Sequence, residues 1–374
     1  MIKSHNLNLP FTTIQEIMKQ NSFIEYHKVL DELFFEYKPF GVSTIWPYRG
    51  ISKECYVVSI PQAMVRGNDG WIFINNALVK EFVMCDRYER IPNFSKLLDV
   101  DIKKYSGSVA VIAELCGDNY FHFLNELLSR LALLEISGIH YDWLYIPNNR
   151  EYMKAFLKLW GIDQSKIISP DGDDFCIQAD MLVIPSFVNN TSIGHKQVGN
   201  FIRPELLLYV KNKLLRSIES NNVNSSFSKR VFISRKDTRR RILNEDQVFD
   251  FFKAKNFERY ELSKMSVIEQ IILFSQAEYI VGEHGAGLSN ILFCKAGTKV
   301  LELFQLLIDG SMWGIAQVNN LDYVPLLLVK TKPDYFVNWA AYADFYFKAY
   351  SAQVNVSVEK VQEFVNTIDN DNVF

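Results

Sequence analysis

Residues 277–304 read AEYIVGEHGAGLSNILFCKAGTKVLELF, a rhythm that indicates a strand, a tight turn into a helix, and a second strand. Short runs of Val, Ile and Leu are typical of strands buried in a parallel sheet. The turn carries, in succession, His284, Gly285, Ala286 and Gly287. Two glycines around an alanine indicate a backbone that must let another group come close.

The same alternation extends outward from this stretch in both directions. It predicts an α/β protein with parallel sheets and helices on their faces. Strands are expected at 230–235, 257–262, 108–115, 142–147, 166–169 and 179–186, and helices at 244–256, 266–276, 119–138, 150–161 and 204–219.

The length of 374 residues favours two domains rather than one core. Residues 220–229, SNNVNSSFSK, are rich in Ser and Asn and poor in apolar side chains, which is typical of a linker. We therefore predict an N-terminal domain at 1–219, in which 1–100 is an extra β-containing region. A second domain is predicted at 230–335, followed by a helical segment at 336–374.

Composition excludes several classes of protein. The net charge of −3 argues against a general nucleic-acid binder. Five widely spaced cysteines without a CxxC pair argue against a zinc or redox motif and fit free thiols in a reducing compartment. Without a signal-like or membrane-spanning stretch, we expect a cytoplasmic protein. The aromatic residues 338–350 leave open a peripheral contact with the inner face of the membrane, although a packed helix is the simpler interpretation.

Two further strand ends in the second half carry charge. Five of the seven residues 235–241 are basic, which suits a phosphate clamp or, alternatively, a solvated loop. Glu302 interrupts an apolar strand and suits either a ligand hydroxyl or a structural ion pair. The glycine turn itself suits either an anion at a helix start or tight helix–strand packing.

In the first half, the predicted helix 119–138 separates into two arcs. His122 and Glu126 are four residues apart and should be neighbours on one face. They suit a base with a partner, an acceptor-binding pair, an incomplete metal site or an ordinary solvent-facing side. One arc is apolar and contains Phe123, Leu124, Leu127, Leu128 and Leu131; the other contains His122, Asn125, Glu126, Ser129 and Arg130.

Taken together, these stretches resemble glycosyltransferase family 61, in the form found in bacterial capsular polysaccharide synthesis. The resemblance rests on YFHFLNELLSRL, ISR followed by RRILNE, GEHGAGLSN and VLELF, in that order. It implies a GT-B-like fold, with two Rossmann-like parallel-sheet domains and a cleft between them. It also implies an inverting, metal-independent transfer from a nucleotide sugar, with no cofactor and no metal.

The resemblance assigns the predicted residues to two sites. The second domain would bind the nucleotide sugar, with Arg235 and Arg240 on its diphosphate. Around that group it places His284 and the amides of Gly285, Ala286 and Gly287, with Asn290 supporting the helix start and Glu302 at the ribose. In the N-terminal domain, His122 and Glu126 would face the acceptor, with Glu126 the expected base.

The resulting hypothesis is a transferase that moves a sugar from a donor, expected to be UDP-linked, to a hydroxyl of a glycan or glycolipid in surface polysaccharide synthesis. One alternative is a non-catalytic module on the same fold that binds nucleotide sugars or glycans. Another is a phosphotransferase, which would use the same arginines together with a metal cluster. A nucleic-acid protein using the basic loop is disfavoured by the net charge.

Overall fold

A computed structural model of the chain describes residues 10–37, 49–83, 100–189, 191–193, 196–198, 202–220, 225–305, 310–328 and 353–370. The chain divides into two compact units, and each is described by itself. The first holds the described residues up to Glu36 and from Arg49 to Leu214; the second holds Tyr37 and those from Leu215 onward.

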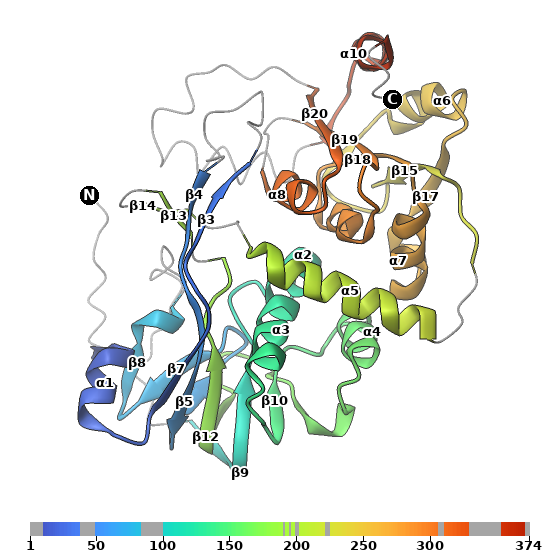
Figure 1. Cartoon of the computed structure of the whole chain (residues 1–374). Helices are drawn as coiled ribbons and strands as arrows, with labels where there is room; N and C mark the ends of the chain where they lie inside the picture. The colour runs from blue at the N-terminus through green and yellow to red at the C-terminus, as the bar shows by residue number, and fades with distance from the viewer. Residues whose placement is uncertain are drawn as a thin grey trace. The chain divides into compact units, whose positions relative to one another are not determined.

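The first unit is built around a ten-stranded sheet, with helices from both halves of its sequence (Figure 1). A separate four-stranded sheet has the order β14-β13-β4-β3. The strands of the first unit, over both sheets, are β1 (Phe11–Thr12), β2 (Glu25–Leu30), β3 (Leu33–Glu36), β4 (Arg49–Ser52), β5 (Cys55–Pro61), β6 (Met64–Arg66), β7 (Trp71–Ile74), β8 (Ala77–Val79), β9 (Ile102–Val111), β10 (Trp143–Tyr145), β11 (Ile167–Ile168), β12 (Cys176–Pro185), β13 (Thr191–Ile193) and β14 (Lys196–Val198). The helices of the first unit are α1 (Ile14–Gln20), α2 (Tyr120–His122), α3 (Leu128–Ser137), α4 (Glu151–Trp160) and most of α5 (Pro204–Ser220), with the short turns η1 (Lys80–Phe82), η4 (Phe123–Leu127) and η5 (Gln164–Lys166).

The main sheet of this unit is mixed, because antiparallel strands extend the predicted parallel ones. Strands β12, β9, β10 and β11 pair in parallel, as expected. However, β5 and β6 both pair antiparallel with β12, so the region predicted as an extra one extends the same sheet. The early strands run antiparallel to one another because short hairpin turns join consecutive strands. Asn75 and Asn76 both have positive φ, 48° and 63°, a conformation that two-residue hairpins favour.

The second unit contains a five-stranded parallel sheet in the order β17-β15-β18-β19-β20, which confirms the prediction for this part of the chain. Figure 1 shows α6 and α7 on opposite sides of these strands. The elements are β15 (Arg230–Ser234), β16 (Arg241–Ile242), α6 (Glu245–Lys253), β17 (Glu258–Glu261), η6 (Leu262–Lys264), α7 (Val267–Gln276), β18 (Tyr279–Glu283), η7 (Ala286–Phe293), β19 (Lys299–Phe304), α8 (Ser311–Val318), β20 (Asp322–Leu327), β21 (Gln353–Val354) and α10 (Val358–Asn370).

Local signals explain where several of these elements begin and end. Ser266 and Glu269 form a reciprocal capping box at the start of α7. Helices α3 and α4 end at Gly138 and Gly161, both left-handed. Strand β20, which carries Pro325, was not predicted. Of the helical segment predicted at 336–374, α10 is observed, whereas the aromatic stretch 338–350 lies outside the described residues.

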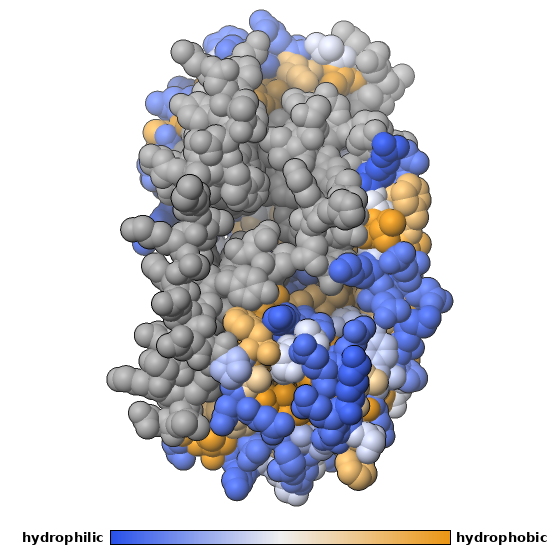
Figure 2. Space-filling view, turned by 90° about the vertical axis from the view of Figure 1, so that its left-hand side faces the viewer, coloured by the Kyte–Doolittle hydropathy of each residue, from blue (hydrophilic) through white to orange (hydrophobic). Residues whose placement is uncertain are grey.

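The described part of the face drawn in Figure 2 is mainly hydrophilic. On the face drawn in Figure 2, apolar residues occur in small groups between hydrophilic ones. Phe23 and Phe34 are the most exposed of the large apolar side chains, at 76% and 62%. No helix among the described residues combines the length and apolar composition that crossing a bilayer requires.

A buried arginine ties the first unit together. Arg130, on α3, is 1% exposed, and its Nη1 donates to the carbonyls of Ile112 and Ala113 at 2.8 and 2.9 Å. Its Nη2 donates to Pro185 at 2.8 Å and to Val111 at 3.3 Å. The guanidinium thus binds the carboxyl ends of β9 and β12, two neighbouring strands, to the helix above them. Carbonyls at the ends of buried strands would otherwise lack donors.

Replacing Arg130 should therefore destabilise the first unit strongly. In Arg130→Met, the strand-end carbonyls and the nearby carboxylates lose a fully buried donor, and we expect a loss of about 3–5 kcal/mol. Urea unfolding of this variant should be compared with that of Lys154→Met, a change at a half-exposed side chain, which should stay within about 0.5 kcal/mol of the wild type. Equal stability of the two variants would contradict the cross-linking role of Arg130.

Candidate functional site

The helix that carries His122 and Glu126 is interrupted by a π-helical turn. Strand β9 ends at Val111, and α2 begins after Asn119, whose side chain accepts from the Phe121 amide. Residues Phe123–Leu127 then form the π-helical turn η4 before α3 begins. Such turns are rare and often found at functional sites, because they change the direction in which side chains project.

The solvent-facing interpretation of this helix is wrong. Asn125, Glu126 and Ser129 are fully buried, although sequence periodicity placed them on the polar arc. The apolar arc packs against α4, where Phe123 contacts Phe156 with ring centroids 6.3 Å apart. On its other side, α3 lies against strands β5, β12 and β2. Both arcs are covered, so the polar side chains must be satisfied inside the protein.

The first histidine–glutamate pair is formed by His122 and Glu126. His122 Nδ1 lies 2.6 Å from Glu126 Oε2, and Asn189 Nδ2 donates to Glu126 Oε1 at 3.2 Å. The His122 side chain is 28% exposed, whereas the Glu126 side chain is 1% exposed. Only the histidine can therefore meet a molecule in solvent without a rearrangement.

The charge on Glu126 determines which nitrogen of His122 carries a proton. Burial alone would raise the pKa of Glu126, but the facing His122 and the hydrogen bonds to it outweigh burial and lower that pKa. An ionised carboxylate only accepts hydrogen bonds, so Nδ1 must donate. The neutral imidazole then carries its lone pair on Nε2, which is the arrangement of a general base.

In the second unit, His284 and Glu302 form a second pair of the same kind. His284 Nδ1 lies 2.6 Å from Glu302 Oε1, and Glu302 is fully buried. The Tyr323 hydroxyl donates to the other oxygen, Glu302 Oε2. The imidazole also stacks on Phe304, with ring centroids 5.0 Å apart. Both Glu302 oxygens are engaged by protein groups, which agrees with the structural pairing that the sequence left open, although its partners were not predicted.

The glycine turn accommodates an arginine. A Cβ atom added to Gly285 would lie 1.6 Å from Nη1 of Arg235 and 2.4 Å from its Cζ. The guanidinium therefore occupies the space that a side chain at position 285 would need, beside His284. Desolvation lowers the pKa of Arg235, as does the neighbouring charge of Arg240, yet arginine stays charged. A side chain at position 287 would be easier to accommodate than one at 285, since an added Cβ would meet only the tip of Leu262, at 2.9 Å.

Residues 286–293 form a 3₁₀ helix rather than the expected α-helix start. Ala286 and Gly287 are its first two residues, and both are partly exposed. Asn290 is buried, and its Nδ2 donates to the Gly287 carbonyl and to Gln270, each at 3.0 Å. These contacts hold the Asn290 side chain between the start of the 3₁₀ helix and α7.

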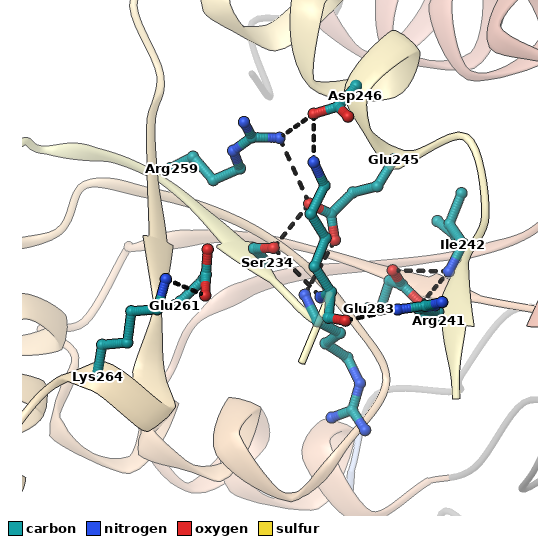
Figure 3. A network of polar contacts seen from close by, with 11 residues as sticks. Ser234, Arg241, Ile242, Glu245, Asp246, Arg259, Glu261, Lys264 and Glu283 are labelled. Carbon is teal, nitrogen blue, oxygen red and sulfur yellow. Dashed lines mark hydrogen bonds and ion pairs between the residues drawn. The ribbon is translucent and has the colours of Figure 1, made fainter. Parts of the chain in front are cut away.

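Buried carboxylates hold the basic loop that follows β15 (Figure 3). Glu245 accepts from the Ser234 hydroxyl at 2.7 Å and from the Arg235 amide at 2.9 Å. Glu283 accepts from the Ile242 amide through both oxygens, at 3.0 and 3.1 Å. The loop is thereby fixed at both ends on the sheet.

The basic side chains of this loop differ in their surroundings. Arg235 and Arg240 are partly buried, and Arg235 Nε donates to the Arg240 carbonyl at 3.3 Å. Lys236 is 2.6 Å from Asp246, so its charge is largely balanced, and Arg239 is exposed. The arrangement favours the clamp interpretation for Arg235 over a uniformly solvated loop.

Several positioning residues were missed from the sequence. Arg130 and Asn189 act on the first pair, Tyr323 on the second, and Glu245 and Glu283 on the loop. Glu283 does carry a local signal, because it ends an apolar strand beside His284, but that position suggests the imidazole as its partner rather than the Ile242 amide that it binds. Asn189 and Tyr323 carry no local signal, since only the fold brings them to their partners.

A sequence model of one protein family matches this chain. The family is described as Glycosyltransferase 61, and the match spans residues 120–301, from the start of α2 to β19. It contains both histidines, Glu126 and the whole loop 235–242. No curated relative matches the chain. The match supports a place in this family and, with it, a glycosyltransferase activity with sugar donor and acceptor substrates.

The contact between Gly285 and Arg235 can be tested by adding one methyl group. Gly285→Ala should displace the guanidinium and weaken the binding of inorganic pyrophosphate at least about tenfold, since charge-assisted hydrogen bonds are lost. Calorimetric titration is the measurement. Gly314→Ala is the matched control, because an added Cβ there meets nothing within 4 Å. Equal pyrophosphate affinity in both variants would argue that Arg235 does not bind anions.

Proposed function

We propose that this protein is an inverting glycosyltransferase that moves a sugar from a nucleotide sugar to a hydroxyl of a glycan or glycolipid. The second unit would bind the donor and the first unit the acceptor. The observation that carries the proposal is the arginine–histidine arrangement at the carboxyl end of a parallel sheet, where such folds bind ligands. Arg235 lies against Gly285 there, directly beside the oriented imidazole of His284.

In this proposal, His122 is the base and Glu126 orients it. This reverses the roles expected from the sequence, because Glu126 is buried and both its oxygens are engaged. The proton of the acceptor hydroxyl passes to His122 Nε2 as the new oxygen–carbon bond forms at the anomeric carbon. Glu126 then stabilises the imidazolium through Nδ1.

The leaving nucleoside diphosphate takes the electron pair of the breaking carbon–oxygen bond. Arg235 and Arg240 would neutralise its growing charge without requiring a metal ion, and His284 would add an Nε2–H donor when its imidazole is protonated. Glu302 was expected to bind the ribose, but its contacts with His284 and Tyr323 favour a role in orienting the histidine. The UDP-linked donor, the GT-B cleft, the cytoplasmic location and the capsular or other surface polysaccharide role stay predictions.

The donor site can be tested by thermal stabilisation with UDP-, GDP-, TDP- and CMP-linked sugars. We expect one nucleotide class to raise the Tm of the wild type and to have no such effect on Arg235→Ala. Arg239→Ala, an exposed arginine of the same loop, is the control and should keep the response. The absence of any response in the folded wild type would contradict the proposed donor site.

The acceptor site can be tested with the donor found in that screen. His122→Asn should keep the donor-induced rise in Tm, because the donor is bound elsewhere, but lose transfer by about 10²–10⁴-fold. The measurement is the transfer of labelled sugar to a glycan or glycolipid fraction of the source cells. Donor stabilisation with unchanged transfer in His122→Asn would exclude this base, whereas binding without transfer in the wild type would favour a non-catalytic module.

A further inference from the structure

A second buried carboxyl group, Glu114, lies close to the first histidine–glutamate pair. It follows the end of β9 and is 1% exposed. Glu114 Oε2 is 3.5 Å from Arg130 Nη1, which is long for a charge-assisted bond. Among the described residues, no N–H or hydroxyl group donates to Glu114 Oε1. A fully ionised carboxylate in this position would leave two lone pairs buried without a donor.

The charged groups that act on Glu114 are Glu126 and Arg130. Arg130 already directs its Nη atoms to four backbone carbonyls, so it offers Glu114 little more than a distant charge. Burial raises the pKa of Glu114 well above its usual range, and the negative charge of Glu126 raises it further. When His122 is neutral, one guanidinium cannot balance two buried carboxylates, so one of them keeps a proton.

We propose that Glu114 carries that proton and donates it to Glu126 as a positioning residue behind the His122–Glu126 pair. Glu126 then accepts from Glu114, from His122 Nδ1 and from Asn189 Nδ2. These donors hold Glu126 ionised and fixed, which keeps the lone pair of His122 on Nε2. The catalytic part of this inference rests on the proposed function, whereas the protonation of Glu114 does not.

The pH dependence of stability tests the protonation without any activity. If folded Glu114 keeps its proton while the unfolded chain loses it near pH ~4.3, the wild type must lose stability relative to Glu114→Gln as pH rises above that value. The loss stops once the pH passes the raised pKa of folded Glu114. The measurement is Tm against pH for both proteins, and Glu151→Gln, with a 91% exposed side chain, controls for loss of one charge. A wild type that gains stability relative to Glu114→Gln over the same range would overturn the proposal.

An infrared spectrum gives a second readout on the wild type itself. At neutral pH we expect a carboxylic-acid C=O band that is absent from Glu114→Gln, or from Glu114→Met if the glutamine variant does not fold. A band of equal size in wild type and variant would come from another group, and Glu114 would then be ionised. That result, or the absence of the band from the wild type, would overturn the proposal.

Kinetics with matched variants tests the positioning role. Glutamine can still donate to Glu126, so Glu114→Gln should keep kcat within about threefold of the wild type, whereas Glu114→Met should lower kcat about tenfold with KM unchanged. Tenfold is the size expected for one lost hydrogen bond to a charged group. A merely structural role predicts equal losses in both variants. Equal kcat values, with the expected trend in stability, would contradict the positioning role while leaving the protonation in place.

Discussion

The guanidinium of Arg130 is the contact on which the chemistry of the first unit depends. It binds the carbonyl ends of β9 and β12 and places a positive charge next to Glu114, with a smaller effect at Glu126. Two carboxyl groups buried behind His122 would be still more unfavourable without a cation near them. The same side chain thus closes the strand ends and permits a buried anion behind His122. Stability and function are therefore coupled at this point, because one guanidinium both closes the sheet end and stands beside the carboxyl groups behind the pair.

Each unit contains a histidine–glutamate pair of the same geometry, but the proposed roles of the two pairs differ. In each, a histidine directs Nδ1 to a buried glutamate at 2.6 Å, which fixes the ring and its tautomer. His122 directly precedes a π-helical turn and keeps a partly exposed ring, as a base requires. His284 follows a parallel strand and lies beside an arginine packed on glycine, as an anion site requires. The surroundings, not the pairs themselves, distinguish the two proposed roles.

The local part of this arrangement could be predicted from the sequence, and the long-range part could not. Alternating apolar runs predicted the parallel sheet of the second unit, and i,i+4 spacing predicted that His122 and Glu126 are neighbours. The π-helical turn has no such periodicity signal, so the burial of the polar arc was missed. The partner of His284 is 18 residues away and is set by the pairing of β18 with β19. The antiparallel pairing of the early strands with the main sheet was not predicted for the same reason, since pairing depends on register rather than on apolar runs.

The central claim is that both imidazoles carry their proton on Nδ1 and that only His284 meets the donor. Nitrogen-15 NMR of histidine-labelled protein tests it directly, with His122→Asn and His284→Asn used to assign the two rings. For the neutral imidazoles, the account predicts a protonated Nδ1 and a bare Nε2 in both rings. Titration with the nucleoside diphosphate that binds should then shift His284 and leave His122 unchanged. A bare Nδ1 in either ring, or a nucleotide response confined to His122, would contradict the account.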